Sequence, residues 1–310
     1  MLNFVRILLL ILCSCTPFLF ATEATPVDKK QAKIAITQII KHPSLDLIAQ
    51  GVIAELKENG YDEANISQDN AQGDIPTAVQ IAQKIASESP DIVVAISTPS
   101  AQTMQKVLQG TKTALVFGAV TDPLGAKLVK NLEKPEGFIT GTVDLPSPED
   151  QVKLMQEMVP SLKTVGLIYN PSEPNSVFQL NQLKKILEQK GLKFVEAPAS
   201  KTSTVQAAAA YLSDKVEAMF IPNDNTVASA LQSLLKVAME ARIPLFASDP
   251  ESVKEGALAG LANDQEKVGR ETGKIVVRIL NGEAPGSISV ETVKISKVYI
   301  NKETRKKLGL

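Results

Sequence analysis

The sequence of 310 residues is poor in the side chains that most often carry covalent or metal chemistry. It contains two cysteines, one histidine and no tryptophan, and aromatic residues make up only 4% of it. Both cysteines, Cys13 and Cys15, lie within the first 21 residues. If that segment is removed, the rest of the chain can form neither disulfides nor thiolate metal sites. A single histidine, His42, cannot build a multi-histidine metal site. We therefore expect no metal and no other cofactor.

The sequence also lacks the patterns of several large functional classes. Its formal net charge is −1, and basic residues are interspersed with acidic ones, so no footprint for nucleic acid is present. Gly269–Lys274 is similar to a phosphate-binding loop, but it has one residue too few between its glycines and continues with Ile275 instead of Ser or Thr. We interpret this segment as a helix. There is no Gly-x-Ser-x-Gly elbow, and a Ser-His-Asp triad would need His42 as its base. These absences favour a protein that is not an enzyme.

The first 21 residues have the pattern of a signal peptide. Arg6 supplies the positive charge, apolar residues follow, and Ala21 ends a segment typical of a cleavage site. The apolar run is short and interrupted by polar residues and Pro17, which argues against a permanent membrane span. An alternative is a lipoprotein signal in which Cys15 is lipidated. Either way, we expect a protein exported to the periplasm or another extracytoplasmic compartment.

One pattern of strand, polar residues and helix organises the rest of the chain. Ala218–Ile221 is a short apolar run typical of a buried strand, Asn223–Thr226 is polar, and a helical pattern starts at Val227. Asp91–Ser97 is a similar strand, followed by Thr98-Pro99-Ser100 and a second helical pattern. In parallel α/β sheets such junctions lie at the carboxyl edge, where ligands bind. The alternative is that Asp224 or Asn225 only caps a helix.

Each of these two units continues with one more strand and an Asp-Pro pair. Ala114–Val120 leads to Asp122-Pro123 and Pro244–Ala247 leads to Asp249-Pro250, which are 25 and 26 residues after Ser97 and Asn223. Gly125–Lys130 is expected to form a short helix after the first pair. The repetition predicts an α/β protein with two Rossmann-like lobes, parallel sheets and a cleft between facing carboxyl edges.

The boundaries of the lobes follow from the proline-rich break at Pro146–Glu149. We expect an N-terminal lobe at 32–145 and a C-terminal lobe at 146–250, joined by a multi-strand hinge. The last part of the chain is divided between them, with approximately 251–282 returning to the first lobe and approximately 283–310 to the second.

Several blocks of the sequence resemble the ABC transporter substrate-binding proteins of the tryptophan/tyrosine type. The blocks are Thr37–Asp46, Ser97–Gln102, Val120–Pro123, Tyr169–Ser176 and Pro222–Ser229. The likeness covers nearly all of 33–300. It implies a type I periplasmic-binding-protein fold and delivery of a small solute, here an amino acid with an aromatic side chain or another small molecule, to an ABC permease and its ATPase. We expect a monomer.

The resemblance and the strand ends together give a set of candidate ligand-binding residues. A zwitterionic amino acid needs helix N-terminal N–H groups for its carboxylate, which Thr98–Ala101 and Asn175–Val177 offer. Its ammonium needs a carboxylate, for which Asp224 is the first choice and Asp122 and Asp249 come next. With so few aromatic residues, stacking on an aromatic ligand would rest on Tyr169, Phe117 or Phe246. The ligand-binding set is Gln38, Ser97, Thr98, Ser100, Thr121, Asp122, Tyr169, Asn175, Ser176, Asp224, Asn225 and Asp249.

Two other functions remain open at this point. The first is a periplasmic receptor subunit that senses a ligand instead of delivering it to a permease. The second is a secreted enzyme, which turnover of an amino-acid derivative would reveal.

His42 follows a predicted strand and could touch a ligand, but a turn histidine beside Pro43 is more typical of a solvated or capping residue.

Overall fold

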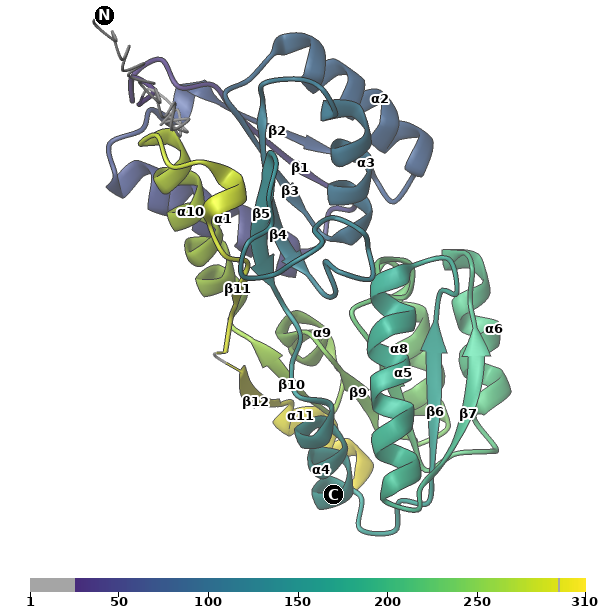
Figure 1. Cartoon of the computed structure of the whole chain (residues 1–310). Helices are drawn as coiled ribbons and strands as arrows, with labels where there is room; N and C mark the ends of the chain where they lie inside the picture. The colour runs from purple at the N-terminus through teal and green to yellow at the C-terminus, as the bar shows by residue number, and fades with distance from the viewer. Residues whose placement is uncertain (1–25, 295) are drawn as a thin grey trace, which may run out of the picture.

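The computed structural model describes residues 26–294 and 296–310, so the proposed signal peptide and Cys15 lie outside the described residues. The chain forms two α/β lobes, one above the other in Figure 1, with the crossings of the chain between them. In the described ranges no helix is both long and apolar enough to cross a membrane.

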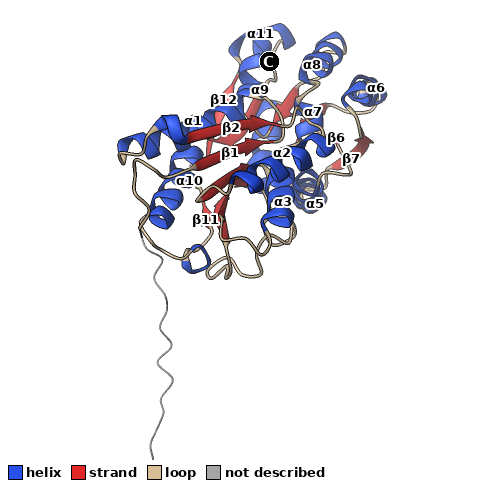
Figure 2. Ribbon diagram, turned by 90° about the horizontal axis from the view of Figure 1, so that it is seen from above, coloured by secondary structure: helices blue, strands red, loops and turns tan. Residues whose placement is uncertain are grey.

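The first lobe is a six-stranded parallel sheet with the order β11-β5-β4-β3-β1-β2. Residues alternate along the buried strands, so one face packs on α1 and α10 and the other on α2 and α3 (Figure 2). The strands are β1 (Ile34–Gln38), β2 (Ile66–Asn70), β3 (Ile92–Ile96), β4 (Ala114–Val120), β5 (Ile139–Val143) and β11 (Glu291–Thr292); the helices are α1 (Pro43–Glu58), η1 (Glu63–Asn65), α2 (Ile75–Glu88), α3 (Thr98–Leu108), α10 (Gln265–Leu280) and η2 (Pro285–Ser287).

The second lobe has a six-stranded sheet with the order β12-β10-β9-β8-β6-β7. All pairs are parallel except β10 with β12. Its strands are β6 (Thr164–Tyr169), β7 (Lys193–Pro198), β8 (Ala218–Ile221), β9 (Leu245–Ala247), β10 (Ala259–Asn263) and β12 (Ser296–Ile300); its helices are α4 (Pro148–Met158), α5 (Pro174–Gln189), α6 (Thr202–Leu212), α7 (Asn225–Ala228), α8 (Leu231–Glu240), α9 (Pro250–Glu255) and α11 (Lys302–Leu308).

The two sheets have the same strand order and differ only in the direction of the edge strand, which is parallel in β11 and antiparallel in β12, so the prediction of two similar lobes is confirmed. In the first, β1 continues to β2 on one side while β3 continues to β4 on the other, and β6 and β8 diverge in the same way in the second. A crevice opens at the carboxyl edge of a sheet where neighbouring strands diverge like this. The two crevices, between β1 and β3 and between β6 and β8, position the site described below.

The chain crosses between the lobes three times, after β5, after β10 and after β11. The last part of the chain divides differently from the expectation. Strand β10, expected in the first lobe, pairs with β9 in the second sheet, and β11, expected in the second lobe, pairs with β5 in the first. Both segments are short, and β11 consists of two exposed polar residues, so the sequence pattern alone does not show which sheet they join.

Two local expectations also change. The expected helix at 125–130 is a series of turns, in which Lys127 adopts a φ of 58° that no continuing helix allows. The single helix expected from Val227 onward is two helices, α7 and α8, separated at Ala230, whose ψ of 18° leaves the helical region.

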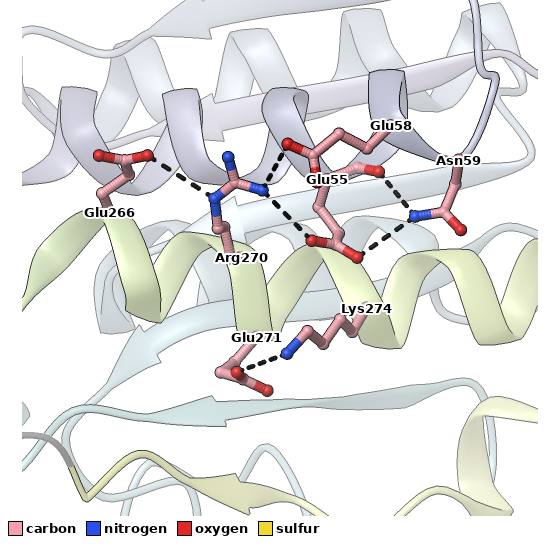
Figure 3. Close-up of polar contacts among 7 residues, drawn as sticks. All are labelled: Glu55, Glu58, Asn59, Glu266, Arg270, Glu271 and Lys274. Atoms are coloured by element: carbon pink, nitrogen blue, oxygen red, sulfur yellow. Dashed lines mark hydrogen bonds and ion pairs between the residues drawn. The ribbon is translucent and has the colours of Figure 1, made fainter.

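Helices α1 and α10 pack unusually closely because glycines face each other. A Cβ atom added at Gly269 would lie 2.1 Å from the carbonyl oxygen of Ile48 and 2.9 Å from Cα of Gly51. The close approach also brings charged side chains of the two helices into contact (Figure 3). There the guanidinium of Arg270 lies 2.9 Å from Glu58 and 3.6 Å from Glu55.

We expect Gly269→Ala to destabilise the protein, although alanine is normally the better helix former by about 1 kcal/mol. The added methyl group would overlap backbone atoms of α1, and overpacking of this kind costs about 1–3 kcal/mol or more. Gly118→Ala is the matched control, because its Cβ would meet its nearest neighbours at 3.5 Å. Urea unfolding measures the free energy of unfolding of both variants. Equal stability of the two would contradict the close helix contact.

Candidate functional site

A cavity lies between the lobes, where the carboxyl edges of the two sheets face each other. Its empty volume, including its opening to solvent, is about 610 Å³. Loops after β1, β3, β4 and β5 supply one side, and loops after β6, β8, β9 and β10 supply the other. The lining residues are Ile40, His42, Ser44, Leu45, Ile48, Ser97, Thr98, Ala119, Thr121, Asp144, Asn175, Ile221, Pro222, Asn223, Asp224, Asn225, Ala228, Asp249 and Gln265.

The N-terminus of α3 presents unsatisfied donors to this cavity. Ser97 occupies the N-cap position, yet its side chain makes no capping hydrogen bond. The hydroxyl groups of Ser97, Thr98 and Ser100 are buried and have no hydrogen-bond partner among the described residues. Ser97 also has a φ of 79°, a strained conformation for a residue with a side chain. A helix N-terminus with free N–H and O–H groups is suited to bind a carboxylate.

His42 both caps a helix and faces the cavity. Its Nδ1 accepts a hydrogen bond from the backbone N–H of Ser44 at 3.3 Å, which confirms the expected capping role. This bond requires Nδ1 to be unprotonated, so the neutral ring carries its proton on Nε2. Nε2 is buried and has no partner within the described ranges. His42 therefore offers the cavity an unused N–H donor as well as capping a helix, so both of the roles considered from the sequence are compatible with its position.

Asp224 is held by donors of its own lobe. Its Oδ1 accepts from the backbone N–H of Val227 at 2.8 Å and so caps α7. Its Oδ2 accepts from the N–H of Asn170 and from the hydroxyl of Ser176 at 2.5 and 2.6 Å. Burial, with a further contribution from the nearby charge of Glu173, raises the pKa of Asp224 to about 7. The geometry matches the capping alternative, with the carboxylate at the cavity wall.

Glu173 completes the anchoring of α7. Its carboxylate accepts hydrogen bonds from the backbone and side chain of both Asn225 and Thr226, at 2.7 to 3.0 Å. Asn175 donates to the same carboxylate and to the carbonyl of Asn223, which leaves its own Oδ1 without a partner among the described residues. The loop before α5 therefore fixes α7 and presents one free acceptor to the cavity.

The charged residues of the cavity are all acidic. Asp144, Asp224 and Asp249 line it, and none of its described lining residues is a lysine or an arginine. Asp249 caps α9 through the N–H of Ser252 and also accepts a hydrogen bond at 2.9 Å from the hydroxyl of Ser44 in the other lobe. A cavity with several carboxylates and no basic side chain favours a ligand that carries a positive charge.

The structure brings seven of the twelve predicted residues to the cavity: Ser97, Thr98, Thr121, Asn175, Asp224, Asn225 and Asp249. Ser100 and Ser176 lie directly behind it, buried at the N-termini of α3 and α5. The other three lie elsewhere: Gln38 donates to Asp46, Asp122 accepts from the N–H of Gly125, and Tyr169 donates to Glu196.

The three aromatic candidates for stacking do not line the cavity. Phe117 and Phe246 are fully buried in the two hydrophobic cores. The phenol of Tyr169 points to Glu196, and burial together with this hydrogen bond raises its pKa to about 12. The apolar wall is aliphatic instead and consists mainly of Ile40, Leu45, Ile48 and Ala119. In parallel sheets, strand aromatics usually belong to the cores, and this explains the correction.

Four polar residues of the cavity were absent from the predicted set, namely Ser44, Asp144, Asn223 and Gln265, in addition to His42. Asp144 directly follows β5, so the rule that selected the polar residues after other strands could have selected it too. Gln265 follows the crossing after β10, and no sequence pattern placed that crossing at the cleft.

A second hollow lies beside the cavity and opens to solvent between the lobes. It has an empty volume of about 1370 Å³ and shares Ile40 and Asn225 with the cavity. Loops of both lobes line it, including the start of α2 and the loop before α6.

Comparisons with known proteins place the chain in a family. Residues 33–310 match the family model described as "ABC transporter substrate binding protein". A tyrosine-binding protein of Clostridioides difficile is 39% identical over 286 residues, which are 91% of this chain and 82% of that protein.

Solved structures give the same result. The structure of an ABC domain from Streptococcus pneumonia in complex with L-Trp is 33% identical, covers 90% of this chain and 95% of its own, and superimposes with a TM-score of 0.86. A substrate-binding protein with adhesive properties from Clostridium difficile, in its ligand-free, open form, is 38% identical, covers 90% and 95%, and has a TM-score of 0.69. The chain therefore belongs to the ABC transporter substrate-binding proteins and has their type I periplasmic-binding-protein fold.

Proposed function

We propose that this protein captures an amino acid with an aromatic side chain in the interlobe cavity and delivers it to the permease of an ABC importer. The observation that carries the proposal is the polarity of the cavity. It has unpartnered hydroxyls at the N-terminus of α3, three carboxylates, and an aliphatic wall. These suit the carboxylate, the ammonium and the apolar side chain of one amino acid. The L-Trp complex and the tyrosine-binding relative support the aromatic choice.

Closure of the cleft around the ligand provides the mechanism. The hydrogen bond from Ser44 to Asp249 joins the two lobes across the cavity. The higher TM-score with the L-Trp complex than with the ligand-free, open structure, despite lower sequence identity, favours a closed arrangement of the lobes in this structure. A ligand that contacts both lobes only when they are closed stabilises that form by its differential affinity. The closed form is then the one that a permease would select.

The compartment, the partners and the monomeric state belong to the same proposal. The apolar N-terminal segment with Arg6 and Ala21 supports export as a signal peptide, with lipidation of Cys15 as its alternative. A sensing role for the same cavity would need a receptor in place of the permease, and no feature of the described residues favours it.

Isothermal titration calorimetry of the purified protein tests the proposal. We expect L-tryptophan, L-tyrosine or L-phenylalanine to bind, and glucose and L-glutamate to bind far more weakly or not at all, because the cavity is acidic and its wall apolar. The ligand should be recovered chemically unchanged. Failure of all three aromatic amino acids would refute the proposed ligand class, and recovery of a converted product would favour the enzyme alternative.

A further inference from the structure

Asp144 is a buried carboxylate for which the fold provides no counter-charge. It follows β5 at the first crossing between the lobes, is 5% exposed and lines the cavity. Among the described residues its carboxylate oxygens accept two hydrogen bonds, from the side-chain amides of Asn263 at 2.7 Å and Gln265 at 3.1 Å. In the described part of the chain no lysine or arginine forms an ion pair with it. Burial raises its pKa, and the charge of Asp249 adds to this effect.

The other two carboxylates of the cavity have structural duties that Asp144 lacks. Asp224 caps α7 and accepts three hydrogen bonds, two of them from backbone N–H groups. Asp249 caps α9, accepts from both the N–H and the hydroxyl of Ser252, and binds Ser44 across the cleft. Within residues 26–294 and 296–310, Asp144 caps no helix and its side chain accepts from no backbone N–H. A buried charge without a partner lowers the stability of the folded protein, so the stability of the fold does not explain why Asp144 is present.

The surroundings of Asp144 connect it to all three crossings. Asn263 and Gln265, which hold its carboxylate, belong to the second crossing, between β10 and α10. The side-chain oxygen of Asn263 in turn accepts a hydrogen bond of 2.7 Å from Ser296, which begins β12 at the end of the third crossing. A chain of hydrogen bonds therefore leads from the cavity through the hinge, and Asp144 is its member at the cavity.

We propose that Asp144 binds the ammonium group of the ligand and ties the bound ligand to the hinge. This inference rests on the proposed function, since it assumes an amino acid in the cavity. The ammonium would occupy the acceptor positions that Asn263 and Gln265 leave free and would supply the missing positive charge. The carboxylate of the ligand then lies toward the N-terminus of α3. Asp224, the first choice from the sequence, is left with a structural role.

The test combines a protein variant with a ligand variant. Calorimetry compares L-tryptophan with 3-indolepropionate, which lacks only the ammonium group, on the wild type and on Asp144→Asn. We expect the wild type to prefer L-tryptophan by roughly 100-fold or more, because a desolvated charge pair is lost with the analogue. Asp144→Asn should lose most of this preference. Asp264→Asn neutralises a half-buried carboxylate that caps α10 at the second crossing and does not line the cavity, so this variant should keep the preference for L-tryptophan.

Each outcome decides between the possibilities. If Asp144→Asn still prefers L-tryptophan as strongly as the wild type does, the ammonium lies elsewhere and the inference is wrong. If the wild type binds neither L-tryptophan nor any other amino acid, the proposed function itself fails.

Thermal melts of the ligand-free proteins give a second, independent readout. The asparagine variant should melt at nearly the same temperature as the wild type, because removal of the unpaired buried charge offsets the loss of one acceptor for the amides of Asn263 and Gln265. A clear loss of stability would assign Asp144 to the fold and overturn the inference.

Discussion

Replacing Ser97 with aspartate should abolish amino-acid binding while the fold stays intact. The new carboxylate would lie at the uncapped N-terminus of α3, where it can accept the free N–H groups and interact favourably with the helix dipole. It would also occupy the place of the ligand carboxylate and repel it. Like charges brought together in a desolvated site cost several kcal/mol, so we expect affinity to fall by about two to three orders of magnitude.

Ser97→Asn is the matched control for this substitution. Asparagine has nearly the same shape and can cap the helix as well, but it carries no charge, so its loss of affinity should be much smaller. Calorimetry with L-tryptophan and thermal melts separate binding from folding for both variants. Equal affinities of the aspartate and asparagine variants would show that the ligand carboxylate does not bind at α3.

The second large effect is expected at Asp224, and it concerns stability. Asp224→Ala removes the cap of α7 and leaves the N–H of Asn170 and the hydroxyl of Ser176 without their acceptor. A lost cap costs about 1 kcal/mol and each of the two buried unsatisfied donors a further 1–3 kcal/mol, so we expect a loss of at least about 3 kcal/mol in the free energy of unfolding. Asp74→Ala removes the cap of α2 at an exposed position and should cost less, because water replaces the lost acceptor.

The loss at Asp224 should also depend on pH. In the folded protein its pKa is raised from 3.8 to about 7, so the folded state keeps a proton that the unfolded state has already released. The contribution of Asp224 to stability is therefore complete below pH 4 and declines as the pH rises to about 7. The difference between wild type and Asp224→Ala in urea unfolding should be larger at pH 5 than at pH 8. The opposite trend would mean that the hydrogen bonds to Asp224 outweigh the effect of its burial.

The sequence allowed the fold to be predicted because the buried strands and the polar residues after them are both local patterns. The pattern of a buried strand followed by polar residues, seen at Ala218–Ile221 and Asn223–Asn225, occurs a second time in similar form. A repeated junction of this kind indicates a repeated lobe. Most candidate residues reached the cavity for the same reason. The end of a parallel strand lies at the carboxyl edge wherever the strand lies in the sheet.

The remaining errors concern properties that depend on partners distant in the sequence. Asp122 and Asp249 follow equivalent strands, but only Asp249 begins a helix that faces the other lobe and meets Ser44. The side chain of Gln38 turns away from the cleft because Asp46 accepts its amide hydrogen. The importance of Asp144 becomes visible only when Asn263 and Ser296, from two other crossings, come to lie beside it.

The way α10 and β11 complete the first lobe also sets the order in which the chain can fold. The apolar face of α1, with Ile48 and Val52, is covered by Val268 and Ile275 from near the end of the sequence. A chain synthesised from its N-terminus therefore exposes this face until nearly all of it is available. The second lobe likewise needs β12 from the last residues. No single cut yields two complete lobes, so a fragment containing only the first 250 residues should expose apolar surface and aggregate, whereas a circular permutation that preserves all three crossings has the contacts it needs to fold.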